Sequence, residues 1–208
     1  MIFLAGLAIG WCPMTKTVMI GGCLLLLGFT SGCSVQFSHS PSTKFANTSV
    51  DFIGNYDCWQ IVDSESGDGK RNGFFGTAEL SRADDQRFPY LCKFRGPDRR
   101  THLFKGQVFR FENTDLAFFK CVQKNGPTVD FFALKLEKSG DEIKALPINE
   151  KFFRAHPDVV KTVTPNRNAK LLIGSDSSAL DSFLMEHREN KALFDEGRAL
   201  TFRRLKAD

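Results

Sequence analysis

The chain has 208 residues, enough for one folded domain, and a net charge of +4 from 28 basic and 24 acidic side chains. A charge this mild, without a long basic run, argues against a nucleic-acid partner and predicts a mixed, solvated surface. With 42% hydrophobic residues and 21 phenylalanines, a chain of this length is able to bury a core without a metal or a disulfide.

Residues 1–32 have the composition of a secretory signal peptide. They contain two apolar stretches, 2–12 and 18–29, separated by a proline and a lysine. If Met14 is the true start, a short basic beginning, a dozen apolar residues and a small-residue cleavage motif follow in the order of such a signal. The alternative is an uncleaved membrane anchor, but residues 18–29 fall short of the roughly 20 that a bilayer core of about 30 Å requires.

The end of this segment, Leu24-Leu-Leu-Leu-Gly-Phe-Thr-Ser-Gly-Cys33, resembles the lipobox of bacterial lipoproteins. The resemblance implies cleavage between Gly32 and Cys33 and attachment of a diacylglycerol, with palmitate-type chains, to the Cys33 thiol. Thr30 departs from the family, which usually has leucine there. In Gram-negative lipoproteins a serine after the cysteine, here Ser34, allows passage to the outer membrane. We therefore expect a lipid-anchored protein of the bacterial cell envelope, at the outer membrane and facing the periplasm.

Two regions are expected after the cleavage site. Residues 33–49 are rich in Ser, Thr, Asn and Pro without a hydrophobic period, which predicts a tether. Residues 50–208 are expected to form a single β-rich domain, because short apolar segments bounded by turn residues recur there. The predicted strands are 50–62, 73–81, 87–95, 102–111, 116–123, 128–137, 141–146, 171–173 and 200–202. Short connections between consecutive strands predict an antiparallel meander.

Three of these segments place an aromatic residue two positions before a glycine: Phe52-Ile-Gly54, Phe74-Phe-Gly76 and Phe104-Lys-Gly106. Glycine within a strand permits a bulge or a sharp bend. The repeat therefore predicts a curved sheet or a small barrel.

Two helices are expected toward the C-terminus, packed on the sheet. Asn149 is placed to cap a short helix that reaches about His156. A second helix is expected to begin at Ser178, with Asp181 in capping-box spacing. Its apolar stripe is Leu180, Phe183, Leu184 and His187. The expected fold class is mainly β, with α and β elements combined.

Three cysteines, Cys58, Cys92 and Cys121, lie in the expected domain. An oxidising envelope permits one disulfide among them with a spare thiol. Three buried thiols acting as small apolar residues are the alternative we favour.

The sequence contains no catalytic, metal or cofactor motif that we recognise. The four histidines, His39, His102, His156 and His187, lack ligand spacing, and no CxxC, HExxH, phosphate loop or nucleophile elbow occurs. We expect each histidine to be structural, and no catalytic residue, metal or cofactor is predicted.

Gly54-Asn-Tyr-Asp-Cys-Trp59, followed by a meander and a late helix, is similar to the first strand of lipocalins and other calycin barrels. Three extra residues separate this glycine and tryptophan compared with the Gly-x-Trp of that family. In lipocalins the tryptophan closes the barrel floor, so the resemblance implies a structural role for Trp59. Residues 146–205 resemble uncharacterised bacterial lipoprotein-like domains, which implies no activity.

Two classes of function remain open. The first is a lipid-anchored binding or interaction domain, which holds an apolar ligand inside the sheet or an envelope protein on its surface. Phenylalanines such as Phe118 and Phe132 are expected to face inward in such a sheet. The second is an envelope hydrolase that uses Asp57, Glu79 or Asp84, although no spacing supports it. We expect the first.

Overall fold

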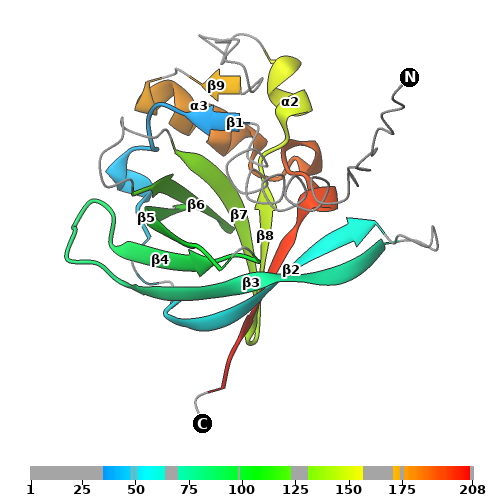
Figure 1. Cartoon of the computed structure of the whole chain (residues 1–208). Coiled ribbons are helices and arrows are strands. Elements are labelled where there is room, and N and C mark those ends of the chain that lie inside the picture. The colour runs from blue at the N-terminus through cyan, green and yellow to red at the C-terminus, as the bar shows by residue number, and fades with distance from the viewer. Residues whose placement is uncertain are drawn as a thin grey trace, which may run out of the picture.

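The computed structural model describes residues 35–47, 49, 51–63, 70–97, 99–122, 131–156, 171–173 and 176–206. Its centre is a closed antiparallel barrel of eight strands, in which β2 to β8 pair in chain order and β10 joins β8 to β2. The barrel strands are β2 (Gly54–Asp63), β3 (Lys70–Arg82), β4 (Tyr90–Arg95), β5 (Thr101–Phe111), β6 (Thr114–Cys121), β7 (Phe132–Ser139), β8 (Glu142–Pro147) and β10 (Leu200–Arg204). The predicted meander is confirmed, and it closes into a barrel (Figure 1).

A second layer covers one side of the barrel, at the top of Figure 1. It contains β1 (Val35–Phe37), β9 (Leu171–Ile173), α2 (Glu150–Arg154) and α3 (Ser177–His187). β1 and β9 pair in parallel as a small separate sheet. Three 3-10 helices complete the elements: η1 (Thr43–Phe45), η2 (Lys191–Leu193) and η3 (Glu196–Arg198). Within the described residues, the helices are too short or too polar to cross a membrane.

The buried residues form two clusters, one on each face of the sheet. The barrel core fills the interior and consists of Phe52, Tyr56, Cys58, Phe75, Ala78, Tyr90, Phe94, Phe104, Val108, Ala117, Phe119, Leu134, Ile143, Ala145 and Leu200. The layer core lies between the outer face of the barrel and the second layer. It includes Val35, Phe37, Phe109, Phe111, Leu116, Phe118, Phe131, Ala133, Phe152, Phe153, Ile173, Leu180, Phe183 and Leu184.

Strand alternation assigns side chains to these two cores. Along β7, Leu134 belongs to the barrel core and Ala133 to the layer core, because successive side chains point to opposite faces. The expectation that Phe132 faces inward is confirmed, since it packs against the barrel core. The same expectation for Phe118 is wrong, because Phe118 is fully buried in the layer core. β5 to β7 are apolar on both faces, so alternation alone does not tell which face lines the barrel.

The residues expected to form a tether are packed against the domain. Phe37 is fully buried in the layer core, and its backbone N–H donates to Phe131 O at 2.7 Å. The Ser42 N–H and hydroxyl donate to the two Asp181 carboxylate oxygens at 3.0 and 2.5 Å. Residues 35–47 therefore belong to the folded domain rather than to an extended spacer, whereas Cys33 lies outside the described residues.

Both helices begin at side-chain caps. Asn149 accepts a hydrogen bond from the Lys151 N–H, as expected for the start of α2. The cap of α3 is Asp176, which accepts from the Ala179 N–H at 2.8 Å, rather than Ser178. The predicted capping-box role of Asp181 is wrong, because its carboxylate holds Ser42.

Two of the repeated glycines allow close approaches within the barrel wall. A Cβ on Gly76 would lie 2.3 Å from the Arg95 carbonyl oxygen, and its φ of +152° disfavours other residues. Gly76 faces an irregularity between Cys58 and Trp59 in the pairing of β2 and β3. A Cβ on Gly106 would lie 2.2 Å from the Phe119 ring. The glycine repeat thus marks a bend and a position covered by an aromatic ring.

Candidate ligand-binding cavity

The interior of the barrel contains a narrow apolar cavity. The cavity has a volume of about 60 Å³, and it opens into a wider space of about 660 Å³ between the side chains that extends out to solvent. The cavity itself is therefore small. Its lining residues are Phe52, Leu80, Tyr90, Cys92, Phe94, Phe104, Val108, Phe119, Phe132, Leu134, Leu136, Ile143, Ala145 and Phe202.

The lining suits an apolar chain and offers little to a polar ligand. Among the described lining residues, Tyr90 and Cys92 alone have a polar side-chain group. Several interior residues, among them Leu136 and Cys92, are only partly buried although they pack against the barrel core. Tightly packed interiors leave few voids larger than a water molecule, so surface left free at interior positions marks incomplete packing.

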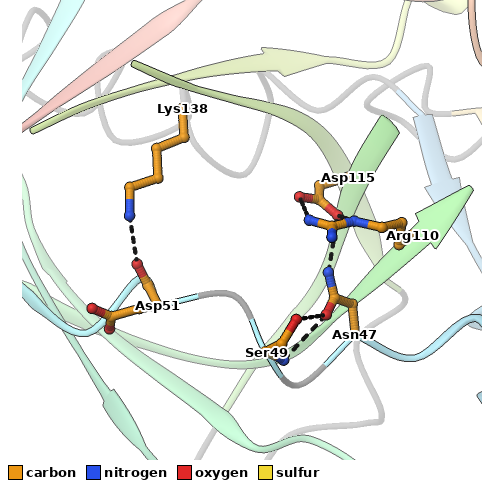
Figure 2. Close-up of polar contacts among 6 residues, drawn as sticks. All are labelled: Asn47, Ser49, Asp51, Arg110, Asp115 and Lys138. Carbon is orange, nitrogen blue, oxygen red and sulfur yellow. Dashed lines mark hydrogen bonds and ion pairs between the residues drawn. The ribbon is translucent and has the colours of Figure 1, made fainter. Parts of the chain in front are cut away.

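A chain segment crosses one end of the barrel, which we call the closing end. This crossing segment comprises the described residues between Asn47 and Ile53. Asn47 donates its N–H to Val108 O at 2.8 Å on β5, and Lys138 at the end of β7 donates to Asp51 O at 3.2 Å. Figure 2 shows these polar side chains around the segment. Between its two anchored ends, Phe52 is buried inside the barrel and lines the cavity.

An arginine–carboxylate pair anchors the start of the crossing segment. Arg110 donates to both oxygens of Asp115 at 2.8 and 2.7 Å, and this contact raises the pKa of the Arg110 guanidinium. The Asn47 side-chain amide donates to the same carboxylate at 3.2 Å, while its oxygen accepts from Ser49 (Figure 2). A bidentate pair fixes orientation better than a single contact does.

The other side of the closing end is held from β2 and β10. The buried Tyr56 hydroxyl donates to Phe52 O at 2.9 Å. Arg204 donates to Ile53 O at 2.8 Å and to the Tyr56 hydroxyl at 3.2 Å. The backbone on both sides of Phe52 is thus fixed, which holds the Phe52 ring in the barrel.

The three cysteines lie on alternate strands, β2, β4 and β6, and all three are free. Each belongs to the barrel core or packs against it. Burial raises the pKa of the Cys92 thiol from 9.0 to about 12, and the pKa of Cys58 is raised further, mainly by burial. The three thiols are free in the structure, and the formation of a disulfide among them in an oxidising envelope stays a prediction.

A histidine lies toward the opposite end of the barrel. His102, near the start of β5, pairs across the sheet with Phe94, and its ring stacks on Phe104 at a centroid distance of 6.4 Å. Both of these phenylalanines line the cavity. The His102 Nε2 atom is shielded from solvent and has no hydrogen-bond partner among the described residues. An unpaired buried polar atom costs about 1–3 kcal/mol, so His102 stands out in this apolar barrel.

The comparisons with known proteins assign no family. No family model matches the chain, and neither curated proteins nor solved structures give a match. Function has to be argued from the barrel itself.

The role that the lipocalin resemblance implies for Trp59 is not observed. Trp59 lies on the outer face of the barrel, where it packs against Phe74 at a ring distance of 5.5 Å and under the Arg203 guanidinium at 5.7 Å. It lines no part of the cavity. The barrel floor is closed by Phe52 instead.

The other candidate residues lie outside the cavity. His39 is exposed, and His156 and His187 pack with Phe152 and Phe183 beside α2 and α3. Glu79 is exposed and paired with Lys93 at 3.0 Å. Asp84 is exposed in the loop after β3, and Asp57 alternates with the inward Cys58 on β2. None of these acids lines the cavity, and the described residues hold no group of three or more potential metal ligands.

Sequence reasoning did not single out His102 as a candidate residue, and it wrongly placed Phe118 on the inner face of the sheet. The signal for His102 was available: a lone polar residue two positions before Phe104, on the same face of a predicted strand. The signal for Phe52 was weaker, because its position depends on the crossing segment rather than on strand alternation.

Proposed function

We propose that this protein is a binding protein of the bacterial cell envelope, which holds a slender apolar ligand inside its barrel. The observation that carries the proposal is the cavity: it is lined by apolar side chains along the barrel and closed at one end by Phe52. Ligand sites are typically concave and apolar, with few polar groups. The barrel mouth and interior are a common place for them.

The shape of the cavity limits the ligand. Each methylene moved from water into an apolar site contributes about 0.8 kcal/mol. A cavity of about 60 Å³ is too small for a fused ring system unless many lining side chains move. A single linear chain requires the smallest movement of the lining side chains, and partly buried lining residues such as Phe132 and Leu136 have room to move. An extended alkyl chain is therefore the ligand shape that this barrel favours.

The anchor is the second part of the proposal. We infer that Cys33 carries the diacylglycerol that ties the barrel to the envelope, at the periplasmic face of the outer membrane. Two or three acyl chains exceed the single chain that gives only marginal, reversible membrane binding. Only Ser34 separates Cys33 from the described segment that begins at Val35, so a lipidated Cys33 would place the second layer of the domain near the membrane.

Replacing Cys33 tests the anchor. The Cys33→Ser variant of the full chain should either appear in the soluble fraction or accumulate as an uncleaved precursor, because the modified thiol is absent. Cys121→Ser is the matched control, since it removes a thiol from the barrel and should leave membrane partitioning unchanged. Normal processing and normal membrane partitioning of Cys33→Ser would refute the lipid anchor.

Native mass spectrometry tests the binding function. The sample is the chain from Ser34 onward, secreted into a bacterial periplasm; it contains every residue of both cores. Its thermal unfolding should match that of the full chain. A reproducible extra mass on the folded monomer, released by denaturation, is the expected result. A ligand-free monomer that also fails to take up added alkyl-chain compounds would contradict the proposal and favour an envelope protein as the partner.

A further inference from the structure

The ligand of this barrel is expected to have a polar end as well as an apolar chain. The inference rests on the proposed function and concerns the orientation and chemical class of the ligand. Its starting point is His102 Nε2, a shielded nitrogen that lacks a partner within the described residues and belongs to a ring next to Phe94 and Phe104, which line the cavity. An imidazole Nε2 that carries a hydrogen, in the Nε2–H tautomer or in the imidazolium, donates a hydrogen bond to a ligand oxygen.

The position of His102 separates the two ends of the cavity. His102 lies beside Phe94 and Phe104 near the start of β5, whereas Val108, farther along the same strand, accepts from Asn47 of the crossing segment. Six residues of strand separate His102 from Val108, about 20 Å at a strand rise of about 3.4 Å per residue. The barrel therefore has an apolar end, closed by Phe52, and an end with an unpaired hydrogen-bonding group.

Charge near the opposite end favours a negative group. Arg95 at the end of β4 and Arg99 in the connection to β5 are exposed there. Their combined charge attracts an anion approaching this end, and a charge-assisted hydrogen bond to an imidazole is stronger than a neutral one. Among polar groups carried by a single alkyl chain, a carboxylate satisfies both observations.

We propose that His102 is the head-group contact of the barrel, and that the ligand is a single-chain carboxylate of the fatty-acid type. Its carboxylate oxygen accepts from His102 Nε2, and its chain runs through the cavity toward Phe52. This hydrogen bond gives the unpaired Nε2 atom a partner, and the alkyl chain contacts only the apolar lining of the cavity.

Decanoate and its methyl ester are the probes, measured by calorimetry on the chain from Ser34. The two share the same chain, but the ester lacks the charge. Wild-type protein should bind decanoate about tenfold more tightly than methyl decanoate, as one charge-assisted hydrogen bond would produce. His102→Phe, which keeps a ring against Phe104, should lower decanoate affinity to that of the ester and leave the ester's affinity nearly unchanged. His39→Phe, at an exposed position, is the matched control and should change neither.

Orientation gives a test that needs no variant. In wild-type protein, nuclear Overhauser contacts should join the decanoate C2 methylene to the His102 ring, and the terminal methyl group should contact lining side chains on the Phe52 side of the cavity rather than the His102 ring. The reverse contacts would overturn the inference, as would equal binding of both probes to wild type and His102→Phe. Those two results leave the proposed function standing. Failure of both probes to bind wild-type protein would instead contradict the proposed function.

Discussion

The two cores of this protein are built from the same kinds of residue but packed to different degrees. In the layer core, Phe37, Phe118, Phe153, Leu184 and Leu193 have no exposed surface. Against the barrel core pack side chains such as Leu80, Phe132 and Leu136, which remain partly exposed around a cavity. The two cores share the wall made by β5 to β7, so the difference does not come from the strands that build them.

We interpret this difference in packing as a difference in role, with the layer core stabilising the fold and the barrel core surrounding the proposed ligand site. Close packing gives the layer core the larger share of stability per residue, because a void forfeits dispersion contacts along its whole lining. Around its cavity the barrel core has less of that stabilisation, as the proposed binding function requires. A protein that needed its barrel only as a scaffold would gain stability by filling it.

The largest expected effect separates the two cores directly. Phe118 contacts Phe37 and Phe109 in the layer core, at ring distances of 5.2 and 5.6 Å. Phe118→Ala should lower the free energy of unfolding by about 3–5 kcal/mol. Phe132→Ala, on the cavity side, should cost only about 1–2 kcal/mol, because part of this ring already faces free space. Urea denaturation of both variants provides the measurement, and equal losses would contradict the division into a packed core and an open one.

The next effect concerns the segment before the barrel. Asp181 is buried and accepts both hydrogen bonds from Ser42, with Lys44 at 3.6 Å. Asp181→Ala should lower the free energy of unfolding by about 1.5–3 kcal/mol, the usual contribution of hydrogen bonds to a charged group. Ser182→Ala, whose hydroxyl is exposed on the same helix, is the control and should change stability little. Unchanged stability of Asp181→Ala, with unchanged protease resistance of residues 35–47, would show that this segment is not held as described.

Part of this fold was predictable from the sequence, and the rest depends on long-range contacts. The strand that became β5 was predicted at 102–111 and lies at Thr101–Phe111, because its length and turns are local signals. β1 was missed, since a three-residue strand in a polar stretch is stable only through its pairing with β9, far along the chain. Asp181 was misread for the same reason, because its partner Ser42 lies 139 residues away.

The candidate site was predictable only in outline. The hypothesis of an apolar ligand inside a curved, phenylalanine-rich sheet came from composition and from the glycine repeat. The sequence did not show which side chains line the cavity, because β6 carries Phe118 and Phe119 on opposite faces and both faces are covered. The sequence placed His102 on the same strand face as Phe104, but the unpaired Nε2 atom is evident only in the structure.

The smallest expected effect is a pH dependence from the buried thiols. In the folded protein burial raises the pKa of Cys92 to about 12, whereas an unfolded thiol ionises near its ordinary value of 9.0. The unfolded state therefore loses protons first, and stability should be constant below about pH 8.5 and fall as pH rises from there toward 12. Urea midpoints measured at pH 7.5, 9 and 10.5 report this fall. Cys92→Ala should have a flatter profile than wild type, and an identical profile would contradict the burial of this thiol.

The most direct test of the central claim places the same side chain inside and outside the barrel. Leu136 lines the cavity and keeps free surface, whereas Leu103 is exposed on the outer face of β5. Leu136→Trp should fill the cavity and reduce decanoate affinity at least tenfold, a change of about 1.4 kcal/mol in binding free energy, while Leu103→Trp should leave it unchanged. Undiminished binding to a folded Leu136→Trp protein would show that the ligand lies elsewhere and that the barrel interior is not the binding site.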